Sequence, residues 1–188
     1  EIMKTDEVSG RNLVIADVIV KYVLQTLDRD MAYLDENATD RLLIYGLEVP
    51  MNISFSGQKI MGHVDRVDAV REGEIRVVDY KTGRNNNDSK TSLDDIFAHE
   101  TPSSGYRLQA FLYSIILDEL LNGKECVGDK DFRWIDKVKT DSARKISPAL
   151  LYIHDPVNSM RDNFIVDILK TPVNDITAIK SEYMTRLD

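Results

Sequence analysis

Two short segments, one that contains Asp65 and one that contains Asp79 and Lys81, are the strongest constraint on how this chain folds. Residues 62–68 and 75–81 are both typical of β-strands, and the polar connection between them is short enough for a hairpin. Asp79 and Lys81 stand two positions apart, so their side chains leave the same face of the second strand. If the strands lie antiparallel, Asp65 reaches the same spot. Two carboxylates and an ammonium together predict a site for a divalent metal and a phosphate.

Composition limits what kind of protein surrounds such a site. At 188 residues with 43% hydrophobic content, the chain is long enough for one domain with a substantial core. A formal net charge of −8 argues against nucleic-acid binding by bulk electrostatics, although a bound metal supplies positive charge locally. No apolar run approaches the roughly 20 residues of a membrane span. The lone Cys126 cannot form an internal disulfide or a multi-cysteine cluster, so we expect a cytoplasmic protein.

The periodicity of apolar residues predicts an α/β fold. Residues 47–55 alternate between apolar and polar, which predicts a strand, and Pro50 suggests that this strand lies at a sheet edge or contains a bulge. With strands at 59–70 and 74–81, it forms an antiparallel meander of three strands. The remaining segments predict a helix at 106–121, strands at 149–154 and 163–169, and a last helix opened by Pro172. The polar run 84–90 predicts a loop beside the site, either a cover or a solvated insertion.

The first helix is predicted at residues 13–27 and is expected to pack on the core. Its apolar residues recur at helical spacing and form one stripe, which we expect to be buried. The stripe consists of Leu13, Val14, Val18, Ile19, Tyr22, Val23 and Leu27.

Each candidate residue also has a structural interpretation. An Asp-x-Lys pair on a strand is commonly a solvated ion pair. The apolar Val77 and Val78 before Asp79, and the turn that Gly83 permits after Lys81, favour a site instead. Metal held by carboxylates can activate water and neutralise charge on a phosphodiester. In that interpretation the backbone carbonyl of Tyr80 adds a ligand.

Three ordered motifs resemble those of the PD-(D/E)xK nuclease superfamily, and more narrowly its RecB-type nuclease domains. These are the runs 62–68, 78–83 and 109–113. The resemblance implies a restriction-endonuclease-like core, with a central mixed β-sheet that includes the antiparallel three-stranded meander and is flanked by helices. It implies roles for the following residues. Asp65 and Asp79 would be metal ligands, Lys81 the catalytic lysine, Gln109 and Tyr113 the Q-x-x-x-Y pair that organises the site and contacts DNA, and Glu48 an outer metal or water contact.

Other interpretations stay open for the residues outside the acidic pair. Gln109 could be a surface polar residue, Tyr113 a core aromatic residue and Glu48 a solvated strand residue. Arg66 and Asp68 point to the opposite strand face from Asp65, so we expect a structural pair there.

The resemblance also implies an activity and a context. It implies a DNA exonuclease dependent on Mg²⁺ or Mn²⁺, acting in DNA repair or recombination with a helicase domain or subunit. We expect a single domain over 1–188 within a larger protein, with a helical part at 1–46, a catalytic core at 47–122 and closing strands and a helix at 123–188.

Two departures from the family pattern keep alternatives open. RecB-type domains usually bring a histidine from an N-terminal helix into the metal site, and residues 13–27 contain none. The lone Cys126 excludes an iron-sulfur cluster within this chain. A non-catalytic module that guides DNA or docks proteins is therefore the alternative function. A site-specific restriction endonuclease is a third interpretation, although no distinct recognition segment is evident.

Overall fold

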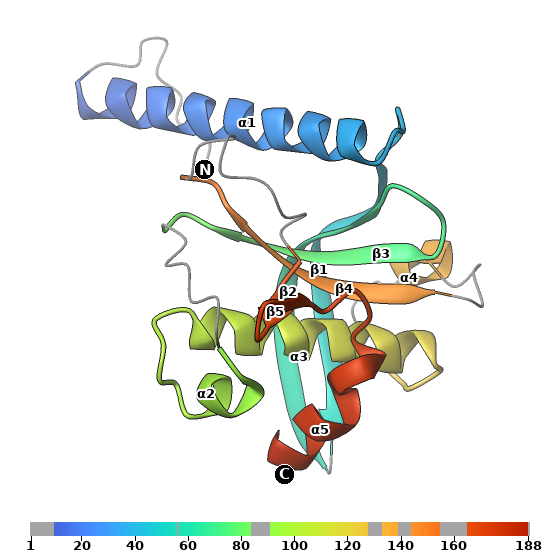
Figure 1. Ribbon diagram of the computed structural model, residues 1–188. Coiled ribbons are helices and arrows are strands. Elements are labelled where there is room, and N and C mark those ends of the chain that lie inside the picture. Colours follow the sequence, from blue (N-terminus) through green and yellow to red (C-terminus); the bar gives the residue numbers. More distant parts are fainter. Residues whose placement is uncertain are drawn as a thin grey trace.

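A four-stranded mixed sheet lies at the centre of the fold, in the order β1-β2-β3-β4 (Figure 1). β1 (Leu43–Phe55) pairs antiparallel with β2 (Gln58–Ala69), and β2 pairs antiparallel with β3 (Glu74–Lys81). β4 (Lys145–Tyr152) lies parallel to β3. The computed structural model describes residues 10–55, 57–83, 91–127, 133–138, 144–154 and 165–187. The predicted meander within a mixed sheet is confirmed, as is the edge position of the strand that contains Pro50.

Helices cover the sheet unequally on its two sides. α1 (Arg11–Glu36) lies on one side, whereas α3 (Ser104–Leu121) crosses the other (Figure 1). The connection from β3 to the parallel strand β4 runs through α3, as a parallel pair requires. The smaller elements are α2 (Leu93–Phe97), α4 (Arg133–Val138), β5 (Asp167–Ile168), β6 (Thr171–Pro172) and α5 (Thr177–Leu187).

The main hydrophobic core lies between the sheet and α3. Ile115 and Ile116 of α3 are fully buried against β3 residues such as Val77. Tyr183 of α5 closes the core from below, and its hydroxyl donates a hydrogen bond to the Leu108 carbonyl at 3.0 Å. Consequently the odd-numbered residues near the end of β3 face α3, because side chains alternate along a strand.

Several element boundaries differ from the sequence-based expectation. The last helix begins at Thr177 rather than at Pro172, although Ile176 before it is fully buried. In the predicted strand 163–169, the described residues form only the short β5 and an isolated bridge from Ile165 to Ala149. The polar run 84–90 lies outside the described residues.

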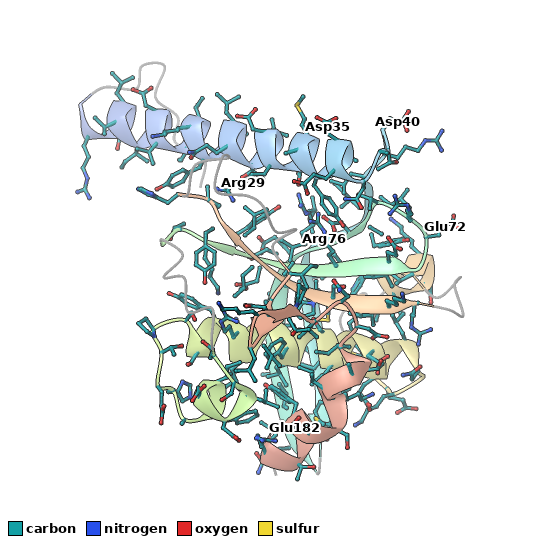
Figure 2. The ribbon with its side chains drawn as sticks, in the orientation of Figure 1. Arg29, Asp35, Asp40, Glu72, Arg76 and Glu182 are labelled. Atoms are coloured by element: carbon teal, nitrogen blue, oxygen red, sulfur yellow. The ribbon has the colours of Figure 1, made fainter. Side chains whose placement is uncertain are left out.

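The prediction that the stripe of α1 packs on the core is wrong. Leu13, Val14, Val23 and Leu27 are all more than half exposed. The helix instead turns a polar face to the sheet. Arg29 is 1% exposed and, with Arg76, lies between α1 and β3 in Figure 2. An apolar stripe indicates which face of a helix avoids water, but it does not show which element packs against that face.

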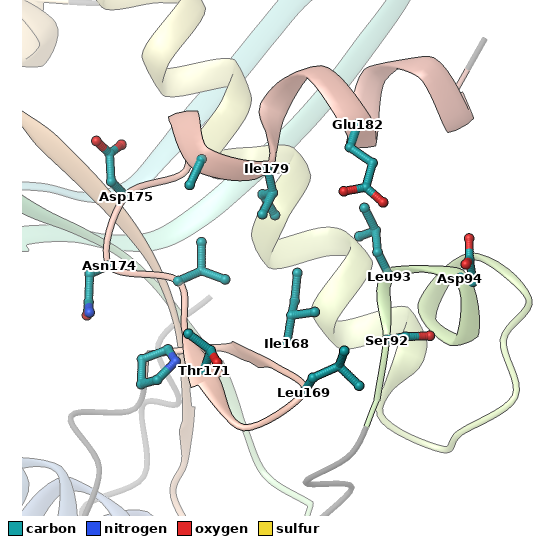
Figure 3. Close-up of a pocket in the computed structure, with 13 residues that line it drawn as sticks. Ser92, Leu93, Asp94, Ile168, Leu169, Thr171, Asn174, Asp175, Ile179 and Glu182 are labelled. Atoms are coloured by element: carbon teal, nitrogen blue, oxygen red, sulfur yellow. The ribbon is translucent and has the colours of Figure 1, made fainter.

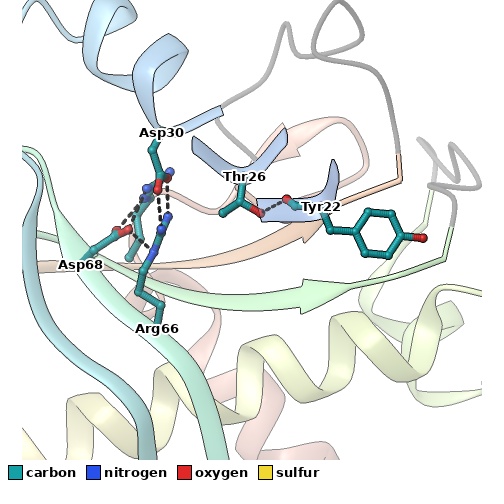
Figure 4. A network of polar contacts seen from close by, with 6 residues as sticks. Tyr22, Thr26, Asp30, Arg66 and Asp68 are labelled. Atoms are coloured by element: carbon teal, nitrogen blue, oxygen red, sulfur yellow. Dashed lines mark hydrogen bonds and ion pairs between the residues drawn. The ribbon is translucent and has the colours of Figure 1, made fainter. Parts of the chain in front are cut away.

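A buried ion network joins α1 to the sheet in place of apolar packing (Figure 4). The guanidinium of Arg66 donates two hydrogen bonds of 2.7 Å to the carboxylate of Asp30 on α1. Its Nε also lies 2.7 Å from Asp68, which in turn accepts two hydrogen bonds from Arg76 at 2.8 and 2.9 Å. The Arg76 guanidinium stacks 3.5 Å from the ring centroid of Tyr33. The predicted structural pair of Arg66 and Asp68 is confirmed.

Within the described residues, no helix combines the length and apolar composition needed to cross a bilayer.

Candidate active site

The pairing of β2 with β3 sets the relative position of the two acidic residues. The β2–β3 ladder ends at the pair of Arg66 with Val78, so Asp65 and Asp79 each lie one residue beyond the last paired position of their strands. The two carboxylates are close enough for Asp65 to influence the charge of Asp79. The Asp65 carboxylate accepts a hydrogen bond of 2.5 Å from the backbone N–H of Tyr80. Asp65 is therefore fixed against the backbone next to Asp79, and the sequence-based expectation of convergence holds for this pair.

Asp79 lies in an environment that disfavours its charge. The residue is 6% exposed, and burial raises the pKa of its carboxyl group. The Lys81 ammonium, which forms an ion pair with Asp79 Oδ2, lowers this pKa, whereas the neighbouring Asp65 raises it further. A buried carboxylate beside a second carboxylate is an arrangement that a bound cation would stabilise.

Lys81 is held by two residues of α3. Its Nζ donates a hydrogen bond of 3.1 Å to Oε1 of Gln109, and it lies 4.4 Å from the ring centroid of Tyr106. Tyr106 and Gln109 are three residues apart, which places them on the same helix face. The sequence analysis did not identify Tyr106, and this spacing is the signal that could have found it. The ammonium is thus confined between the end of β3 and the first turns of α3.

Gln109 is in turn positioned by Tyr113 one turn further along α3. Its Nε2 donates a hydrogen bond of 3.0 Å to the Tyr113 hydroxyl. Tyr113 is 8% exposed and belongs to the hydrophobic core, so it is a core aromatic residue that also holds Gln109. The two interpretations of this residue are therefore compatible.

Gly62 of β2 provides the space into which the Tyr113 ring fits. A Cβ atom at this position would lie 2.5 Å from Tyr113 Cε1 and 2.6 Å from its hydroxyl oxygen. Any other residue would push the ring away. Gly62 lies in the same motif as Asp65, so one strand supplies an acidic residue and the seat of the Tyr113 ring.

Glu48 is not brought into a ligand cluster with the two aspartates. It is exposed on β1 and has a positive φ of 50°. In the described part of the chain, no group of three His, Cys, Asp or Glu side chains could hold a metal ion. The role of Glu48 and that of the Tyr80 carbonyl stay predictions.

A comparison with known protein families shows the family to which the chain belongs. The sequence model of the PD-(D/E)XK nuclease superfamily matches residues 6–163. The chain belongs to this superfamily. Its α/β architecture is consistent with the restriction-endonuclease-like fold, and members of the superfamily are generally nucleases that typically use divalent metals. A search of curated proteins and a search of solved structures each returned no match.

The donor set fits the metals that PD-(D/E)XK nucleases typically use. Mg²⁺ prefers oxygen ligands and is commonly bound through one or two protein carboxylates, with water and substrate oxygens at the other positions. Asp65 and Asp79 provide two carboxylates, which is enough for such an ion. Carboxylate oxygens suit Mg²⁺ or Mn²⁺, whereas structural zinc sites are built mainly from Cys and His ligands.

A separate pocket of about 630 Å³ lies between α2, the β5–β6 hairpin and α5 (Figure 3). Ile168, Val173 and Ile179 give it an apolar wall, and Glu182 lies at its edge. Asp65, Asp79 and Lys81 do not line it. The candidate active site therefore lies at the end of β3 rather than in this pocket.

Proposed function

We propose that this chain is a metal-dependent DNA nuclease domain of the RecB type, which hydrolyses phosphodiester bonds from DNA ends. The observation that carries the proposal is the meeting of three groups where the pairing of β2 with β3 ends. Asp65 is fixed by the Tyr80 N–H, while Asp79 is buried and ion-paired with Lys81. Carboxylates that hold a metal ion, with an ammonium group beside them, can activate a water molecule and stabilise charge on a phosphate.

Asp65 and Asp79 are the proposed ligands of Mg²⁺ or Mn²⁺, with the Tyr80 carbonyl as a third. When bound, the ion supplies charge neutralisation at the phosphate and lowers the pKa of a water molecule. The burial of Asp79 supports this role, because a carboxylate at 6% exposure has few water molecules to displace when it binds a cation.

Lys81 is the proposed catalytic lysine. Its ammonium can orient the attacking water and stabilise the negative charge that develops on the phosphate oxygens. Gln109 and Tyr106 support this role because they restrict the position of Nζ from the α3 side. Fixing such a group before the reaction lowers the entropy lost on reaching the transition state.

The proposed biological context is DNA repair or recombination, with a helicase domain or subunit as partner. The net charge of −8 supports a division of labour in which another domain holds most of the DNA backbone. Gln109 and Tyr113 are the proposed pair that organises the site and contacts DNA from α3, with Gln109 outermost and Tyr113 holding it, and Glu48 is the proposed outer contact.

Cleavage of labelled DNA tests the chemistry. The chain with Mn²⁺ should shorten linear single-stranded or double-stranded DNA, and Lys81→Ala should reduce the rate at least about 100-fold, the scale for loss of one preorganised group. Lys145→Ala is the matched control, because this exposed lysine lies at the opposite end of the β3–β4 pair. Equal rates for Lys81→Ala and the unaltered chain would show that the activity comes from another site or a contaminant.

Circular DNA tests whether cleavage starts from DNA ends. An exonuclease leaves a closed circle intact while it degrades the linear form, whereas a restriction endonuclease gives a defined fragment ladder. Cleavage of the circle at discrete positions would contradict the exonuclease assignment.

A non-catalytic module is the second candidate, and one observation favours it. Among the described residues, Asp65 and Asp79 have no third His, Cys, Asp or Glu ligand beside them. Calorimetric titration with Mn²⁺ separates the two candidates. A nuclease site should release heat that Asp79→Ala abolishes, whereas a scaffold should give no heat that depends on Asp79.

A further inference from the structure

α1 presents an extended apolar surface to solvent. Ten of its large apolar side chains are between 42% and 64% exposed, and they run from Leu13 to Met31 (Figure 2). A helix that is apolar on its outer side is normally covered by another element. Near the C-terminal end of α1, the side that faces the sheet is polar, with Arg29 and Asp30 in or beside the buried ion network. Among the described residues, this outer face has no cover.

The exposed residues follow the spacing of a coiled-coil seam. Alternating steps of four and three residues lead along one side of the helix, and every position but one is apolar. The seam consists of Leu13, Asp17, Val20, Leu24, Leu27 and Met31. Arg29 and Tyr33, which anchor the helix to the body, lie on the opposite side of the helix. The seam therefore points away from the molecule that carries it.

We propose that a second copy of this chain covers this face, through an antiparallel pair of α1 helices. The five apolar side chains of the seam, with Val14 and Val23 beside them, are about half exposed and offer roughly 200–400 Å² of apolar surface. One side of a standard protein interface contains about 450 Å² of apolar surface, so the seam suits a dimer at the small end of the interface range. The helix of 26 residues is about 39 Å long and provides a continuous contact.

The seam residues favour the antiparallel direction. In an antiparallel pair, Leu13 lies opposite Met31 of the second copy, Val20 opposite Leu24, and Asp17 opposite Leu27. Every seam position then has a partner, because the six positions are symmetric about residue 22. A parallel pair in register would instead place the two Asp17 carboxylates against each other, and like charges repel. This inference is independent of the proposed nuclease chemistry, since none of these residues belongs to the candidate site.

Sedimentation equilibrium of the 188-residue chain tests the proposal. The unaltered chain should sediment at twice its mass of 21.4 kDa at micromolar concentration. Leu24→Glu/Leu27→Glu should raise the dimer dissociation constant at least about 100-fold, because each change places a charge in the centre of the interface. Both side chains are exposed in the single chain, so circular dichroism should show that the variant remains folded.

Two further variants separate this interface from general stickiness. Met61→Glu is the matched control, because this residue is 71% exposed on β2 and lies outside α1; its dimer should be unchanged. Asp17→Leu should lower the dissociation constant, since it removes the single polar residue of the seam. If the chain stays monomeric at a concentration of roughly 0.1 mM, the proposal is overturned and the apolar face of α1 would be assigned to a different protein. Equal dissociation constants for the unaltered and the Glu-substituted seams would also overturn it.

Discussion

Gly62→Ala should damage the site without changing any group that carries charge. A Cβ at this position would lie 2.5 Å from Tyr113 Cε1, whereas ordinary contact begins at 3.4 Å, so the ring must retreat by about 0.9 Å. The ring is 8% exposed and packed in the core, which leaves little room for that movement. Overpacking of this kind costs about 1–3 kcal/mol of stability.

The same movement should affect Lys81 through Gln109. The Tyr113 hydroxyl lies 3.0 Å from Gln109 Nε2, so a shift of this size weakens or breaks the bond, at about 1 kcal/mol. Gln109 then holds Lys81 less firmly. We expect a total loss of about 2–4 kcal/mol in the free energy of unfolding. We also expect kcat for DNA cleavage to fall by about 10- to 100-fold.

A double-mutant cycle measured by urea unfolding isolates this contact. Tyr113→Leu removes the atoms that the new Cβ would meet, so in that background Gly62→Ala should cost less than about 0.5 kcal/mol, and a coupling energy of about 1–3 kcal/mol should result. Gly105→Ala is the matched control, because a Cβ there meets nothing within 4 Å. An equal cost of Gly62→Ala in both backgrounds would refute the proposed seat for the Tyr113 ring.

Three other perturbations test the remaining parts of the structure. Burial raises the pKa of the Asp79 carboxyl group, so the folded state binds the Asp79 proton more tightly than the unfolded state does. The free energy of unfolding therefore falls as pH rises from the usual carboxyl pKa through the raised value. Asp79→Asn should flatten this pH dependence of Tm and raise Tm at neutral pH, and a lower Tm would contradict the argument. Arg66→Ala should cost about 3–5 kcal/mol in urea unfolding because it leaves Asp30 and Asp68 without their partner. Arg71→Ala is the control, because it removes an exposed ion pair with Glu74 and should cost at most about 1 kcal/mol. Similar losses for Arg66→Ala and Arg71→Ala would count against a buried network. Mn²⁺ at 100 times its Kd should raise the free energy of unfolding of the unaltered chain by about 2.7 kcal/mol, and it should leave the stability of Asp65→Ala unchanged. Equal shifts in Tm for the two proteins would show that the ion binds elsewhere.

The sheet and its acidic pair could be predicted from the sequence because both depend on local patterns. Alternation along 47–55 and the short connection before Glu74 determine the order and direction of the first three strands. Once these strands are antiparallel neighbours, the position of Asp65 close to Asp79, one residue beyond the last pair of the ladder, follows from counting residues. Lys81 follows from the period of two along β3.

The orientation of α1 could not be predicted, because a hydrophobic stripe shows which face avoids water and not what it contacts. Its position depends on long-range ion pairs, such as the one from Asp30 to Arg66, for which the sequence contains no local signal. Gly62 was missed for a similar reason. Its importance comes from a ring 51 positions later in the chain, at Tyr113, and only the packed structure brings the two together.

The ion network and the acidic pair lie on opposite faces of β2 and β3, so the network can fix how these two strands pair at the site. Buried ion pairs are often less stabilising than apolar packing of the same volume. Asp68 and Arg76, however, are directly opposed in the β2–β3 ladder, so their bidentate pairing defines the register of these strands. A slip by one residue would turn Asp65 to the α1 side and separate it from Asp79. We infer that the charged layer beneath α1 is retained because it specifies the register on which the site depends, which apolar side chains of similar size would specify less strictly.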